Sequence, residues 1–317
     1  MFRLITIILI SVCALSACAP DKRVSFVNTG VIAQIPVETV QECLNADPNY
    51  YLGLISCGDY YIASYYKDSL FFGILDSEFQ TLHRMVRRGR GPDEYLAPVI
   101  PGQCRQLDSS RLTFSLLERP KGLFEDMDAD CPSGAIRVLN SRRFPIEMQD
   151  MRILFRTPYG FFGVLDDEQQ RVFTCDTALT SIIWHKRIAV KRDYPGQMNN
   201  RQSLGCISPD SLNIAFAYLN QPRIDFWKAS GQAVRTLVFS DLQGELLDIC
   251  CDQDSVFLLY ESQDGDNREL LRLDWEGQVR HRSDIRSASV ICLKKDALIT
   301  LRHTDEGAVF SKLVFGF

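Results

Sequence analysis

The residues best suited to binding a ligand are arginines and lysines that occur in four groups, in a chain whose formal net charge is −5. A guanidinium group presents a fork of N–H donors that matches the oxygens of a carboxylate or phosphate. If the groups converge in the fold, they form a positively charged site for an anionic small molecule, a glycan or a protein segment. The groups are Arg84, Arg87, Arg88 and Arg90; Arg142 and Arg143; Lys186, Arg187, Lys191 and Arg192; and Arg280, Arg282 and Arg286.

Catalytic and metal-binding patterns have less support. The sequence contains no Gly-x-Ser-x-Gly or His-Glu-x-x-His motif, and its four histidines are far apart. Residues 126–130 begin like a calcium-binding loop, but Cys131 stands where that loop needs Gly and Arg137 where it needs Glu. We expect a solvated hairpin there. The sequence predicts no catalytic residue, no metal ligand and no cofactor.

Composition excludes several classes of protein. The chain has 317 residues, of which 46% are hydrophobic and 24% charged, so it can bury a full-sized core and is not a disordered segment. Lys and Arg number 35 against 40 Asp and Glu, which gives no overall positive field for nucleic acid. We therefore expect no nucleic-acid partner.

The amino terminus has the pattern of an export signal. Residues 1–18 contain one basic residue, Arg3, then an apolar run from Leu4 to Leu15, which is too short to span a bilayer comfortably. Leu15-Ser16-Ala17-Cys18 resembles the bacterial lipobox, in which the cysteine thiol is lipidated and the preceding peptide is removed. The resemblance implies lipidation at Cys18 and a membrane partner. The alternative is an ordinary signal peptide, with Cys18 incidental.

The residue after the cysteine bears on localisation. Ala19 follows Cys18 where an Asp would stand in proteins kept at the inner membrane, so the resemblance to lipoprotein sorting signals favours the outer membrane. We expect a lipid-anchored monomer in the cell envelope, on either the periplasmic or the surface side.

The rest of the chain predicts a repeated all-β unit. Short apolar runs broken by Asp, Gly, Asn and Pro recur after residue 50, and no long helical period does. Six turns are marked by Asp59, Asp108, Tyr159, Asp210, Asp254 and Asp296, at spacings of 49, 51, 51, 44 and 42 residues. Four-stranded units of about 40–50 residues are typical of propeller blades. Residues 48–317 are therefore predicted to form a six-bladed β-propeller of four-stranded blades.

The sixth unit has only three strands, so closure of the ring needs a strand from elsewhere. We expect residues 19–47 to supply it after a short tether. Val24–Ile35 has strand-like residues and is assigned to the last blade, and Val37–Leu44 is expected to form a short helix that connects this strand to the first blade.

Cysteines recur in the same frame. Four of them stand four residues before a marker, and Cys57 is displaced from this place by two residues. Equivalent places in different blades should lie around the ring beyond disulfide reach, so we expect buried free thiols there. Any disulfide is expected among Cys43, Cys131 and Cys175. The four equivalent cysteines are Cys104, Cys206, Cys250 and Cys292.

One motif follows the fourth strand of the first unit. Gly89-Arg90-Gly91-Pro92-Asp93-Glu94-Tyr95 resembles the Gly-x-Gly-Pro-x-Glu-aromatic signature of the TolB-like six-bladed β-propeller lipoproteins of Bacteroidetes. Asp93 stands where the family usually has Gly. The resemblance implies the fold and lipidation but no reaction. A structural corner between blades one and two is the competing interpretation of the motif.

The links between blades cross the face where propellers usually bind ligands, so the candidate site residues are drawn from them. The competing explanation is that charges on outer strands prevent sheets from pairing edge to edge. The rival function is a metal-dependent hydrolase or lactonase, since six-bladed lactonases take their metal ligands from distant blades. The candidate ligand-binding residues are Arg88, Arg90, Glu94, Tyr95, Arg143, Arg192 and Arg286.

Overall fold

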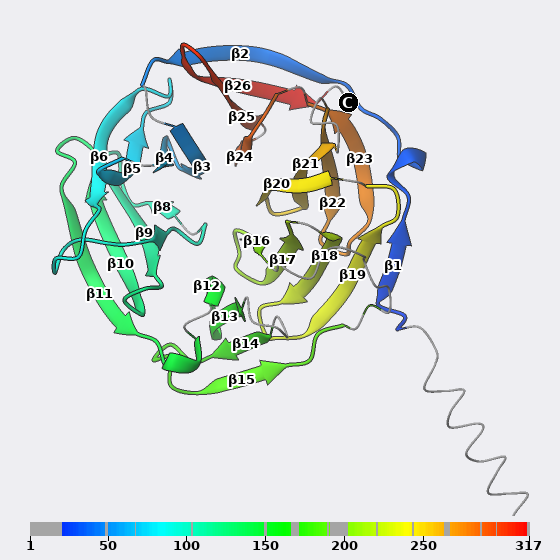
Figure 1. Ribbon diagram of the computed structural model, residues 1–317, viewed down its shortest axis with the longest axis horizontal. Helices are drawn as coiled ribbons and strands as arrows, with labels where there is room; N and C mark the ends of the chain where they lie inside the picture. The colour runs from blue at the N-terminus through cyan, green and yellow to red at the C-terminus, as the bar shows by residue number, and fades with distance from the viewer. Residues whose placement is uncertain are drawn as a thin grey trace, which may run out of the picture.

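The computed structural model describes residues 21–317, except 48–49, 67, 103, 149–150, 166–170, 189, 191–201, 220, 243, 263–266, 286, 296 and 316–317. Cys18, Arg192 and Arg286 therefore lie outside the described residues. Within them, six sheets are arranged in a ring, as Figure 1 shows, and consecutive strands within each blade are antiparallel. The predicted six-bladed β-propeller is confirmed.

Each blade has an inner strand at the centre of the ring and an outer strand at the rim (Figure 1). From inner to outer, blade 1 contains β3 (Tyr50–Cys57), β4 (Tyr60–Tyr66), β5 (Leu70–Leu75) and β6 (Thr81–Arg87). Blade 2 contains β7 (Pro98–Val99) and β8 (Cys104–Gln106), then β9 (Arg111–Glu118), β10 (Leu123–Asp130) and β11 (Ile136–Arg143). Blade 3 contains β12 (Met151–Thr157), β13 (Gly160–Leu165), β14 (Val172–Cys175) and β15 (Ile182–His185).

The remaining blades follow the same order. Blade 4 contains β16 (Ser203–Ile207), β17 (Asn213–Tyr218), β18 (Gln221–Lys228) and β19 (Ala233–Phe239), with β1 (Val24–Val27) added outside β19. Blade 5 contains β20 (Gly244–Cys251), β21 (Ser255–Ser262), β22 (Arg268–Asp274) and β23 (Val279–Asp284). Blade 6 contains β24 (Val290–Lys294), β25 (Ala297–Thr304), β26 (Gly307–Phe315) and β2 (Val37–Asn45). Two short 3-10 helices are η1 (Thr29–Val31) and η2 (Ile146–Met148).

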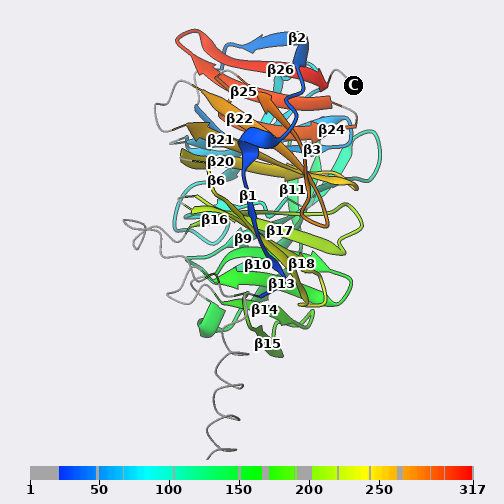
Figure 2. The same cartoon turned by 90° about the vertical axis from the view of Figure 1, so that its right-hand side faces the viewer.

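The hydrophobic core lies between blades, because the sheets pack face to face around the ring (Figure 2). For example, Phe162 of blade 3 packs with Phe216 and Trp227 of blade 4 in one buried cluster. No helix in the described residues is long and apolar enough to cross a membrane.

The ring is closed by an N-terminal strand, as predicted, but not by the strand we assigned. Val37–Asn45 pairs antiparallel with β26, from Val37 opposite Phe315 to Asn45 opposite Ala308. The expected helix over Val37–Leu44 is therefore wrong. The segment has few buried residues, so its apolar alternation is weak.

Val24–Ile35 lies along the rim instead. Its first part, β1, pairs parallel with β19, and Ile35 donates its backbone N–H to the carbonyl of Arg282 on β23 at 2.9 Å. The N-terminal segment thus contacts the outer strands of blades 4 and 5 and then itself forms the outer strand of blade 6, beside β26 (Figure 1).

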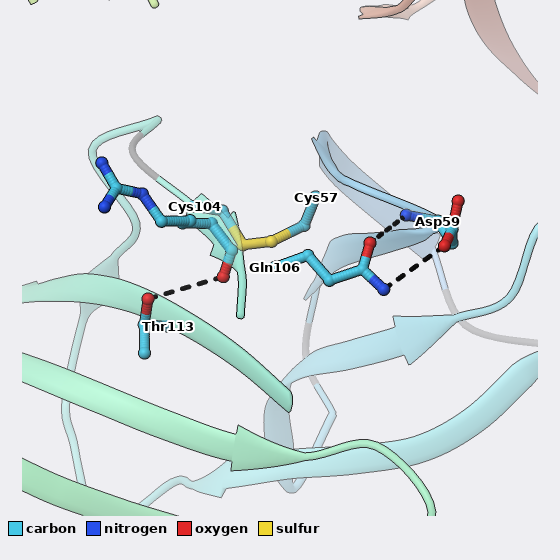
Figure 3. The surroundings of a disulfide bond; sticks show 6 residues. Cys57, Asp59, Cys104, Gln106 and Thr113 are labelled. Carbon is cyan, nitrogen blue, oxygen red and sulfur yellow. Dashed lines mark hydrogen bonds between the residues drawn. A yellow bond between two sulfur atoms is a disulfide. The ribbon is translucent and has the colours of Figure 1, made fainter. Parts of the chain in front are cut away.

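One disulfide contradicts the predicted cysteine pattern. Cys57 at the end of β3 is bonded to Cys104 at the start of β8, with their Cα atoms 5.4 Å apart (Figure 3). Inner strands of adjacent blades converge on the axis, so equivalent positions come within bridging distance. Cys43, Cys131 and Cys175, where we expected a disulfide, are free thiols.

Polar contacts support the same junction between blades 1 and 2. Gln106 accepts the backbone N–H of Asp59 at 2.8 Å and donates to the Asp59 carboxylate at 3.3 Å (Figure 3). Gly58 adopts a positive φ of 62°, and a Cβ atom there would lie 1.8 Å from the Gln106 side-chain oxygen. The turn between β3 and β4 of blade 1 therefore packs against Gln106 on the inner strand of blade 2.

We predict that Cys104→Ser lowers the free energy of unfolding by about 2–4 kcal/mol, because the bond closes a long loop in the unfolded chain. Urea denaturation without reductant measures the change. Cys43→Ser, which removes a half-buried free thiol, is the matched control and should change the value by less than about 1 kcal/mol. Equal losses in the two variants would contradict a stabilising bond.

Candidate functional site

One candidate site lies in the central channel. A cavity of about 690 Å³ runs along it and is lined by the inner strands of all six blades. Most of its wall is aliphatic, with Leu54, Ile153, Leu204, Ile249 and Leu293 each coming from a different blade. A cavity of this size and character is typical of a small-molecule site.

Three arginines line this cavity: Arg88, Arg119 and Arg152. Arg88 follows β6 in the link to blade 2, Arg119 follows β9, and Arg152 lies near the start of β12. Links between blades and turns after second strands lie at the same end of a propeller, because strands alternate in direction within each blade. The three guanidinium groups therefore come from the same end of the channel.

Local contacts hold two of these side chains. Arg88 donates from Nε to the carbonyl of Asp68 at 2.9 Å and lies 3.9 Å above the centre of the Phe71 ring. Arg152 donates from Nε to the carbonyl of Ser203 in blade 4 at 3.4 Å. It also occupies a β-bulge between Met151 and Ile153, a feature that redirects side chains.

Arg119 differs from the other two arginines. Its Nε atom is buried and has no hydrogen-bond partner within the described part of the chain. A buried N–H group without an acceptor is costly, since it has lost its hydrogen bonds to water. Arg119 also lines the channel cavity, so an anionic ligand there would lie next to its guanidinium group.

Asp248 of blade 5 is the acidic residue of the channel wall. Its two carboxylate oxygens accept the backbone N–H groups of Ile249 and Ile291, each at 2.8 Å. Burial nevertheless raises the pKa of Asp248 to about 7, so this carboxyl titrates near neutral pH.

Free thiols complete the wall on the side of blades 4–6. Burial raises the pKa values of Cys206, Cys250 and Cys292, so these groups stay protonated at neutral pH. A protonated thiol is a poor nucleophile. The cysteines therefore serve as apolar wall rather than as reactive groups.

The Gly-x-Gly-Pro motif forms a tight corner between blades 1 and 2. Glu94 accepts the backbone N–H of Gly91 at 2.8 Å, and its carboxylate fills the space that a side chain at Gly89 would need. Tyr95 is buried and donates its hydroxyl to Glu125 of β10 at 2.7 Å. Both side chains thus hold the corner together, and Lys121 donates to the carbonyls of Gly91 and Glu94.

Of the five predicted ligand-binding residues that the structure describes, only Arg88 lies in the channel wall. Arg90 lies exposed in the corner, and Arg143 lies exposed at the end of β11, the outer strand of blade 2. The sequence does contain a signal for Arg119 and Arg152. Both residues stand next to strand ends that lie at the same end of the propeller as the links between blades.

Other basic residues of the four groups are paired with acids. Arg84 contacts Asp47 and Asp68, and Arg282 contacts Glu269. Arg187 lies 3.0 Å from the fully buried Asp225. Burial alone would raise the pKa of Asp225, but Arg223 and Arg187 hold it below its ordinary value. These pairs support the interpretation that many of the basic residues stabilise the blades.

Residues 126–130 are not a hairpin, as we expected, but part of the third strand of blade 2. Asp126 is paired with Arg142 and Arg156, and Asp128 with Arg111 and Arg137. Within the described residues, no group of three or more His, Cys, Asp or Glu side chains is placed to hold a metal ion.

Comparison with known proteins shows which solved structures have a similar fold. No protein-family model and no curated protein matches the chain. The calcium-binding protein regucalcin of Agrobacterium tumefaciens strain C58 is 11% identical with a TM-score of 0.53, over 90% of this chain and 98% of regucalcin. The Cps50 (Swd1) β-propeller domain of Myceliophteria thermophila is 10% identical with a TM-score of 0.53, over 88% and 99%. Likeness at these identities shows the fold alone.

The raised pKa of Asp248 predicts a pH dependence of stability. An unfolded Asp releases its proton near pH 4, whereas the folded carboxyl keeps it until about pH 7. Between these values the folded state binds more protons, so the free energy of unfolding falls as the pH rises, by up to about 1.4 kcal/mol per pH unit.

Urea denaturation between pH 4 and pH 8 measures this slope. The wild-type protein should lose stability relative to Asp248→Asn as the pH rises, whatever the variant's stability at one pH. The exposed Asp254→Asn variant is the control and should keep the wild-type slope. Parallel curves for wild type and Asp248→Asn would show that Asp248 titrates at its ordinary pKa.

Proposed function

We propose that this propeller is a binding module that takes an anionic ligand at the arginine-lined end of its channel. The main support for this proposal is that Arg88, Arg119 and Arg152 line one cavity of about 690 Å³. Charge-assisted hydrogen bonds from guanidinium groups to an oxyanion are about twice as strong as neutral ones. Arg119 lines this cavity, and its buried Nε atom has no hydrogen-bond partner among the described residues.

The wall of the channel selects the rest of the ligand. Beyond the arginines, aliphatic side chains of all six blades line the cavity. Burial raises the pKa of Asp248, the acidic residue of this wall. An apolar body would gain from burial against this wall, whereas a densely charged molecule would lose hydration without compensation. The proposed ligand therefore combines one anionic group with an apolar body.

We further propose that the protein is a lipoprotein of the cell envelope, related to the TolB-like propeller lipoproteins of Bacteroidetes. The lipobox at Leu15–Cys18 and the Gly89–Tyr95 corner support this proposal. Lipidation of Cys18 would attach a monomeric propeller to the outer membrane. Each methylene group that an acyl chain buries in the bilayer adds about 0.8 kcal/mol to membrane affinity, so the attachment would be stable.

The binding proposal is tested with 8-anilino-1-naphthalenesulfonate, which carries one sulfonate on an apolar aromatic body and fluoresces in apolar sites. Arg119→Leu should raise its Kd about tenfold, because the loss of one charge-assisted hydrogen bond costs about 1.5 kcal/mol or more. Arg143→Leu, which removes an arginine from the outer rim, is the matched control and should change Kd less than about twofold. Equal effects of the two substitutions would place the bound probe elsewhere.

The rival function, a metal-dependent hydrolase, makes a different prediction. A metal that binds the folded state raises the melting temperature by mass action. We expect no rise with calcium chloride at about millimolar concentration, with magnesium chloride at equal ionic strength as the control. A calcium-specific rise in melting temperature would favour the hydrolase over a simple binding module.

A further inference from the structure

The described part of the chain begins close to the proposed lipid anchor. Residues 21–24 already form a turn, in which Val24 donates its N–H to the carbonyl of Asp21 at 2.9 Å and Arg23 is paired with Asp21. Three Cα-to-Cα steps separate Cys18 from Asp21, and each spans at most about 3.8 Å. Asp21 therefore lies within about 11 Å of the lipidated residue.

The segment that follows this turn is fastened to the rim. β1 pairs with β19 from Val24 opposite Thr236 to Val27 opposite Phe239. Asp241 then accepts the backbone N–H groups of Thr29 and Gly30, each at 2.8 Å. The chain near the anchor therefore cannot swing away from blade 4 without breaking these bonds.

The same rim exposes apolar and basic side chains. Phe26 on β1 is 58% exposed and Val31 in η1 is 80% exposed. Lys22 and Arg23, beside the start of β1, are also exposed. Exposed apolar side chains next to cations suit the boundary between acyl chains and anionic headgroups.

We propose that the outer rim of blade 4, formed by Asp21–Val31, is a membrane-contact surface that rests on a lipid bilayer and holds the propeller on its edge. This inference rests on the proposed lipidation of Cys18. It assigns Phe26 and Val31 to the headgroup boundary and Lys22 to anionic headgroups.

The orientation has a consequence for ligand access. The rim contact lies outside β19 at the edge of the ring, whereas the channel cavity is lined by the inner strands at the centre of the ring (Figure 1). A propeller seated on its edge leaves both faces open to solvent. The arginine-lined end of the channel is then reachable while the protein is anchored.

The experiment uses the full chain, acylated in a bacterial host and placed in vesicles of phosphatidylcholine and phosphatidylglycerol with brominated acyl chains. Bromine quenches tryptophan fluorescence only at short range. Phe26→Trp should be quenched at least about twofold more than the wild-type protein, whose tryptophans lie elsewhere. Leu82→Trp is the matched control, because Leu82 is a 40% exposed residue of β6, the outer strand of blade 1 across the ring.

Flotation and the mass of the N-terminal peptide are measured on the same samples, with Cys18→Ser as the unlipidated reference. An acylated protein that floats and shows strong quenching at position 26 but not at position 82 supports the membrane-contact surface. An acylated protein that floats with equal quenching at both positions contradicts the membrane-contact surface but remains consistent with lipidation of Cys18. A chain that is not acylated overturns the anchor and this inference together.

Discussion

The pairing of β2 with β26 joins the two ends of the chain, and the channel depends on it. Val37–Asn45 supplies the fourth strand of blade 6, so that blade has an outer strand as complete as those of the other five. Without it, β26 would present an unpaired edge and blade 6 could open away from blade 1. A closed ring fixes the inner strands at the axis, and only fixed inner strands give the channel a defined wall and a defined end where arginines meet.

Other contacts reinforce the ring at different places. The Cys57–Cys104 disulfide joins the inner strands of blades 1 and 2, while the Glu94 corner fixes the link between them. On the opposite side, β1 and Ile35 bind the outer strands of blades 4 and 5. The N-terminal segment thus connects blades at the rim of the ring, and the disulfide connects two blades near its axis.

The sequence predicts the repeat but not every strand within it. Third strands such as Leu70–Leu75 are apolar on both faces, because blades pack on both sides of them, and they are easily recognised. Val37–Asn45 is an outer strand with mostly exposed side chains, so its polar pattern resembles a helix or loop. The disulfide was missed because a linear repeat does not show that inner strands of adjacent blades converge.

The candidate site is likewise only partly predictable from the sequence. Arg88 was predicted because it follows an outer strand in a conspicuous basic run. Arg119 and Arg152 lie outside the four basic groups and reach the same cavity because blades 2 and 3 follow blade 1 around the axis. Arg187 and Arg282 looked equally suitable and are instead paired with Asp225 and Glu269. Local spacing does not distinguish an arginine that binds its own blade from one that faces the channel.

The most direct test is anion localisation in a crystal of residues 19–317 grown with sodium bromide. Anomalous scattering places bromide ions without any assumption about the natural ligand. The account predicts a bromide ion in the channel within contact of Arg119 and beside Arg88 or Arg152. Bromide ions found only at outer-strand arginines such as Arg143, with none at the end of the channel, would contradict it.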